Sequence, residues 1–179
     1  MEVVIVVGIV GILTTIILSA FVDYRKDGPN SIGLWTDDST KKQIEDISKI
    51  VSVVSADCGR LGLSGKSFSE KLLKDFISSA SGTIKTFNIP LLEEASIKDE
   101  SARKEVLENI KPILEYADKF DVRIGLESDL NAQELLSFIN EVNSPRVGIC
   151  YDIGNCTSYG FNCPEEIRLL GDKIFEIHL

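Results

Sequence analysis

The fold is decided by residues 122–179, which read VRIGLESDLNAQELLSFINEVNSPRVGICYDIGNCTSYGFNCPEEIRLLGDKIFEIHL. This stretch holds three short apolar runs, which are typical of buried β-strands. The expected strands span residues 122–127, 147–152 and 174–178. Segments with the helical spacing of apolar residues separate them. Strands that alternate with helices predict an α/β fold with a parallel sheet.

Helix boundaries in this chain are marked by capping residues and prolines. Asn131 is followed three residues later by Glu134, a capping box that predicts a helix start. Pro164 suits the first turn of a last helix, which Gly171 is expected to end. Pro112 lies inside an earlier helical pattern and is expected to kink or split it. Upstream patterns predict helices at 39–50, 67–80 and 99–120, and strands at 16–22, 51–56 and 83–89.

The composition is that of a folded soluble domain, with 179 residues of which 44% are hydrophobic and 26% charged. Nineteen basic residues against 28 acidic ones give a net charge of −9, which argues against a nucleic-acid partner. A small anionic substrate stays open, because a few local groups can hold it. The chain has one histidine, His178, so sites that need several histidines are excluded.

Cysteine usage indicates a reducing compartment. The four cysteines are too sparse for a disulfide scaffold, and no pair has the C-x-x-C spacing. We therefore expect four reduced thiols in a cytoplasmic protein. The alternative is a loop bridge between Cys156 and Cys163.

Residues 3–22 carry no charge and are long enough to span a bilayer. Buried strands are the favoured interpretation, because Glu2 precedes the run, no Lys or Arg does, and Gly8 and Gly11 interrupt it. The alternatives are a membrane anchor through residues 3–22 and a gene start that has replaced a native segment.

Three expected strands end in a residue that can bind a metal ion. Glu127, Asp152 and His178 follow one another at intervals of 25 and 26 residues, about one strand–helix unit each. If the units build a barrel, these strand ends converge on one face. Two carboxylates and an imidazole suit Mn²⁺, Co²⁺, Mg²⁺ or Zn²⁺ better than copper. The alternative is that the carboxylates cap loops and the histidine binds no metal.

Glu176 and Cys150 lie two residues before His178 and Asp152, so they point to the same side of the sheet. The Glu176 carboxylate either hydrogen-bonds to groups behind the site or is satisfied by water in the interior. We favour the second interpretation.

The segments VRIGLESDL, VGICYDIGNCTSYG and GDKIFEIHL resemble the sugar phosphate isomerase/epimerase family of xylose isomerase-like TIM barrels. That family includes ketose 3-epimerases and hexulose-phosphate isomerase-like proteins. The resemblance covers residues 20–179 and is strongest from Pro90 onward. It implies a partial (β/α)8 TIM barrel of about six βα units, truncated at both ends. Residues 1–15 are then an atypical apolar segment, and 16–179 a single incomplete domain.

The resemblance also implies the roles of single residues. Glu127, Asp152 and His178 correspond to three of the family's four metal ligands, and Glu127 also to the base. Asn155 stands where relatives contact the substrate. The fourth ligand, a glutamate on the eighth strand, has no counterpart here. The implied function is a metal-dependent sugar or sugar-phosphate isomerase or epimerase of carbohydrate metabolism, which removes a proton next to a carbonyl and passes through an enediolate.

Two other functions compete with this one. The first is a catalytically incomplete barrel remnant or sugar-binding module, whose exposed sheet edges predict self-association into a homo-oligomer. The second is an endonuclease IV-like nuclease, which is disfavoured by the single histidine and the net charge of −9.

Overall fold

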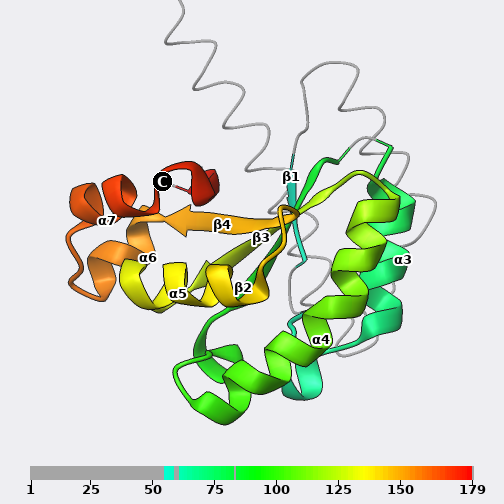
Figure 1. Ribbon diagram of the computed structural model, residues 1–179, viewed down its shortest axis with the longest axis horizontal. Coiled ribbons are helices and arrows are strands. Elements are labelled where there is room, and N and C mark those ends of the chain that lie inside the picture. The colour runs from blue at the N-terminus through cyan, green and yellow to red at the C-terminus, as the bar shows by residue number, and fades with distance from the viewer. Residues whose placement is uncertain (1–54, 59–60, 83, 179) are drawn as a thin grey trace, which may run out of the picture. The chain divides into compact units, whose positions relative to one another are not determined.

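The computed structural model describes residues 55–58, 61–82 and 84–178 (Figure 1). These residues form a five-stranded sheet in the order β1-β2-β3-β4-β5, and every neighbouring pair is parallel. The strands are β1 (Ser55–Asp57), β2 (Thr86–Leu91), β3 (Arg123–Ser128), β4 (Val147–Asp152) and β5 (Ile174–His178). The predicted parallel α/β architecture is therefore confirmed. Because every neighbouring pair is parallel, the carboxyl ends of all five strands lie at the same edge of the sheet.

Helices connect the strands. They are α3 (Glu70–Ala80), α4 (Glu100–Lys119), α5 (Ala132–Val142), α6 (Ile153–Ser158) and α7 (Cys163–Leu170). Short 3-10 turns are η2 (Gly65–Ser67), η3 (Glu93–Ala95) and η4 (Gly171–Lys173). Helices α3 and α4 pack side by side (Figure 1). The short helix α6 follows β4 without a break and was not predicted.

The capping residues act as the sequence indicates, whereas one proline inside a helix does not. The Asn131 side chain accepts hydrogen bonds from the backbone of Gln133 and Glu134 at the start of α5. Pro164 lies in the first turn of α7, and Gly171 follows its last residue. The expectation that Pro112 splits a helix is wrong, because α4 continues through it as one 20-residue element. Packing of the buried face of α4 compensates for the hydrogen bond that proline cannot donate.

The core lies between the helices and one face of the sheet. Phe87, Ile89, Ile124 and Leu126 alternate along β2 and β3, and all four are fully buried. The helices contribute residues at helical spacing, which are Leu73, Phe76, Ile77, Val106, Ile110, Ile113 and Ala117. Because side chains alternate along a strand, the opposite face of the same strands carries a different set of residues.

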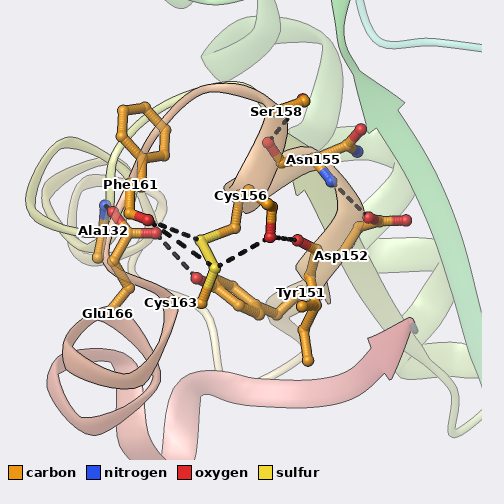
Figure 2. Close-up of a disulfide and its surroundings, with 11 residues drawn as sticks. Ala132, Tyr151, Asp152, Asn155, Cys156, Ser158, Phe161, Cys163 and Glu166 are labelled. Carbon is orange, nitrogen blue, oxygen red and sulfur yellow. Dashed lines mark hydrogen bonds between the residues drawn. A yellow bond between two sulfur atoms is a disulfide. The ribbon is translucent and has the colours of Figure 1, made fainter.

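Cys156 and Cys163 form a disulfide that joins α6 to α7 (Figure 2). The expectation of four reduced thiols is therefore wrong for this pair. Helix α6 turns the chain back, so that the two Cα atoms lie 6.0 Å apart, within the range of disulfides. Cys58 and Cys150 are buried and unbonded to one another, as expected.

Within the described ranges, no helix combines the length and apolar character that a membrane span requires. The apolar run at 3–22, the helix at 39–50 and the strand at 16–22 lie outside these ranges, as does most of the strand at 51–56. Those expectations and the division at residue 15 stay predictions.

Candidate functional site

The inner face of the sheet, opposite the helices, carries polar residues near the carboxyl ends of the strands. Asn88 pairs with Gly125, and Pro90 pairs with Glu127. Between β4 and β5, Cys150 pairs with Glu176 and Asp152 pairs with His178. Residues paired in register between parallel strands lie on the same face, so these side chains share one surface.

A β-bulge aligns the last two strands. The register is Ile149 with Ile174 and then Cys150 with Glu176, so Phe175 is the additional residue on β5. Without this shift, Asp152 would lie opposite Ile177. The bulge therefore brings the imidazole and the Asp152 carboxylate to the same face, as bulges near functional sites commonly do.

Asn155 connects two of the expected ligands. Its side-chain Nδ2 donates a 2.7 Å hydrogen bond to Glu127 Oε1. Its backbone N–H donates a 2.7 Å hydrogen bond to Asp152 Oδ1, which thereby caps the start of α6 (Figure 2). Helix α6 thus holds Asn155 between the carboxyl ends of β3 and β4.

His178 is surrounded by three side chains. Its Nε2 lies 3.3 Å from Glu176 Oε1, and its Nδ1 lies 4.0 Å from Asp152 Oδ2. The Cys150 sulfur lies 3.4 Å from Nε2 and 3.6 Å from Nδ1. Ligand atoms of Glu127, Cys150 and His178 all lie within 4.8 Å of one another.

The surroundings shift the pKa values of these residues in different directions. Burial raises the pKa of Glu127, although the nearby His178 lowers it in part. Hydrogen bonds from His178, Asn88 and Ser55 lower the pKa of Glu176 to about 2. Hydrogen bonding with Cys150 and with Glu176 raises the pKa of His178 to about 11. Protonation and metal binding therefore compete for the ring of His178.

These residues fit a divalent cation. Carboxylate oxygen, imidazole nitrogen and sulfur are the donor types that Zn²⁺, Co²⁺ and Mn²⁺ accept, and their spacing lets one ion reach several of them. The negative charge of the carboxylates would offset the charge of such an ion in this partly buried position.

The structure brings together most of the residues expected from the sequence. Glu127 and His178 lie in one cluster, Asp152 lies beside it, and Asn155 contacts Glu127. Sequence reasoning missed the membership of Cys150 in the cluster, although the two-residue period of the strand places it on the correct face.

The favoured interpretation of Glu176 as a carboxylate satisfied by water is wrong. Ser55 donates to its Oε1 and Asn88 donates to its Oε2, at 2.7 Å and 2.9 Å. Both donors lie on distant strands, so only the tertiary fold reveals them.

A family model described as xylose isomerase-like TIM barrel matches residues 30–179. The chain belongs to this family. Membership and the sheet topology together confirm the expected partial TIM barrel.

Solved structures of other proteins have similar folds. A xylose isomerase domain protein from Planctomyces limnophilus is 18% identical with a TM-score of 0.67, over 84% of this chain and 60% of that one. A 3-keto-D-glucoside 4-epimerase from E. coli is 15% identical with a TM-score of 0.67, over 82% and 65%. A D-psicose 3-epimerase, solved with D-fructose, is 17% identical with a TM-score of 0.64, over 79% and 57%.

Among curated proteins, the chain resembles 3-oxo-isoapionate decarboxylase of Pectobacterium atrosepticum. The two are 26% identical over 77 residues, which is 42% of this chain and 28% of the relative. This xylose isomerase-like chain thus spans less than two thirds of the proteins that it matches.

Proposed function

We propose that this chain carries part of the active site of a metal-dependent sugar or sugar-phosphate isomerase or epimerase. The observation that supports it best is the approach of Glu127 to His178, with Asp152 4.0 Å from the imidazole, at the carboxyl ends of three successive strands. Active sites of TIM barrels lie at this end. Among the similar folds are a 3-keto-D-glucoside 4-epimerase and a D-psicose 3-epimerase.

In this proposal, Glu127, Asp152 and His178 hold a divalent ion, which is Mn²⁺, Co²⁺, Mg²⁺ or Zn²⁺. When bound, such an ion supplies Lewis-acid stabilisation of negative charge on substrate oxygen atoms.

Glu127 is the proposed base that takes the proton from the carbon next to the carbonyl. Burial raises the pKa of its carboxyl, which makes the carboxylate a stronger proton acceptor. Asn155 donates to Oε1 and so fixes the orientation of the Glu127 carboxylate. Asn155 would also lie beside the substrate, which agrees with the contact that the family resemblance implies.

A barrel remnant that binds a sugar without turning it over is the second candidate. It has the same residues at the carboxyl ends of the strands but no turnover, so the test below separates it from the enzyme. Self-association into a homo-oligomer and a cytoplasmic location stay predictions under either function.

Metal-dependent proton exchange tests the proposal. The full chain is loaded with Mn²⁺ and incubated with D-fructose in D₂O, and deuterium at the carbon next to the carbonyl is measured by NMR. We expect exchange in the wild type and a loss of about 100- to 10,000-fold in Glu127→Gln. Glu108→Gln is the matched control, because Glu108 is exposed on α4 and its replacement changes the net charge equally.

The outcomes separate the two candidates. Mn²⁺ binding with exchange that depends on Glu127 supports the enzyme. Sugar binding without exchange favours the binding module, and equal exchange in wild type and Glu127→Gln would overturn the role of Glu127.

A further inference from the structure

We propose that Glu176 is a positioning residue that fixes the ring of His178, so that Nδ1 is the nitrogen offered to the metal ion. This inference rests on the proposed metal-binding function, and it assigns a role to a residue outside the expected ligand set.

Glu176 is anchored from two other strands before it meets His178. The Ser55 hydroxyl on β1 donates to Oε1, and the Asn88 amide on β2 donates to Oε2. The two donors precede Glu176 by 121 and 88 residues. An ionised carboxylate only accepts hydrogen bonds, so these donors fix the orientation of Glu176 as an anion.

The Asn88 side chain is itself held in one position. Its residue is 2% exposed, and its Oδ1 has no hydrogen-bond partner among the described residues. A Cβ on Gly125 would lie 2.3 Å from this Oδ1, so the amide fits only because residue 125 has no side chain. A buried polar atom without a partner is unfavourable. The Asn88 amide is therefore held in an orientation that leaves Oδ1 unpaired while Nδ2 donates to Glu176.

The imidazole ring is placed between Glu176 and the expected ligands. Nε2 lies 3.3 Å from Glu176 Oε1, whereas Nδ1 lies 4.0 Å from Asp152 Oδ2. A proton on Nε2 that is donated to Glu176 leaves the lone pair on Nδ1, beside Asp152. The Cys150 sulfur lies at similar distances from both nitrogens, so it does not select either. Carboxylate partners of metal-binding histidines fix the tautomer in this way.

The single histidine makes the experiment unambiguous. The full, untagged chain is labelled with ¹⁵N-histidine and titrated with Zn²⁺, which is diamagnetic. Imidazole correlation spectra then report both nitrogens of His178 alone. We expect Zn²⁺ to shift Nδ1 to the value of a ligating nitrogen, while Nε2 keeps its proton.

Glu176→Gln is expected to weaken Zn²⁺ binding about 10- to 100-fold and to speed exchange of the Nε2 proton. Ser55→Ala keeps the carboxylate and removes one of its donors, so a smaller change of the same kind is expected if Glu176→Gln folds poorly. Glu108→Gln should match the wild type in both readouts.

Each outcome bears on the proposal differently. If Zn²⁺ shifts the resonance of neither nitrogen, the proposed metal site is wrong, and so is the inference that rests on it. If Zn²⁺ binds through Nε2, the metal site stands and the role of Glu176 is overturned. Binding through Nδ1 with wild-type affinity and proton exchange in folded Glu176→Gln also overturns it.

Discussion

The two faces of the sheet belong to the same strands but differ in the contacts that their side chains make. On the helix-covered face, Phe87 and Leu126 are wholly buried among apolar neighbours. On the inner face, Asn88, Glu127 and Glu176 each have specific hydrogen-bond partners. Apolar contacts are many and individually weak, whereas each polar contact is single and directional. We therefore expect the helix-covered face to contribute most of the stability and the inner face to carry the proposed metal binding.

The largest expected effect lies on the helix-covered face. Phe87→Ala removes a fully buried ring that packs edge-to-face on Phe76, with centroids 5.2 Å apart. We expect the unfolding free energy, measured by urea titration, to fall by about 3–5 kcal/mol. In the fraction that stays folded, Zn²⁺ affinity should be unchanged. A loss of metal affinity larger than the unfolded fraction explains would contradict the separation of the two faces.

The second largest effect is expected from the addition of one methyl group on the inner face of the sheet. In Gly125→Ala the new Cβ overlaps Asn88 Oδ1, so the amide must move away from Glu176. We expect about 1–3 kcal/mol of destabilisation from overpacking, together with weaker Zn²⁺ binding. Gly82→Ala is the control, because a Cβ there meets no atom within 4 Å. Unchanged Zn²⁺ affinity in folded Gly125→Ala would show that Asn88 does not act through Glu176.

The smallest effect is a pH dependence of the metal-free chain. The pKa of Glu176 is lowered to about 2, so its contribution to stability is present above its usual value of 4.5 and is lost as the pH falls below it. The pKa of His178 is raised to about 11, so its contribution is present below 6.5 and is lost as the pH rises. Groups that act on the pair are Ser55, Asp57, Asn88, Glu127, Cys150 and Asp152.

The pair should therefore stabilise the fold most between pH 4.5 and pH 6.5. We expect the difference in unfolding free energy between wild type and Glu176→Gln to be largest in that window and to shrink on both sides. Urea titrations at several pH values measure it. A difference that does not vary with pH would show that the two residues are not coupled.

The sequence predicts the features of this molecule that depend on local pattern. The apolar runs at 147–152 and 174–178 coincide with β4 and β5, and Asn131 starts α5 as its capping box indicates. These signals are contained in a few neighbouring residues. The expected ligands follow from the same pattern, because they stand at strand ends.

The features that the sequence did not predict depend on contacts between distant segments. The partners of Glu176 lie on β1 and β2, so nothing near residue 176 indicates them. The disulfide depends on how α6 turns after β4, and α6 is only six residues long. Pro112 does not split α4, because packing against the sheet and α3 outweighs the lost hydrogen bond, and the kink expected as the alternative stays a prediction.

The bulge in β5 determines which single-residue deletions in this strand leave the histidine on the inner face. Phe175 is the additional residue of that strand, since pairing continues from Ile174 to Glu176 across it. A strand shorter by that one residue would keep Asp152 opposite the histidine, in regular pairing. Removal of Ile177 instead would shift the histidine by one position and turn it to the helix-covered side. The position of a deletion within this short strand, rather than its size, therefore decides whether the site survives.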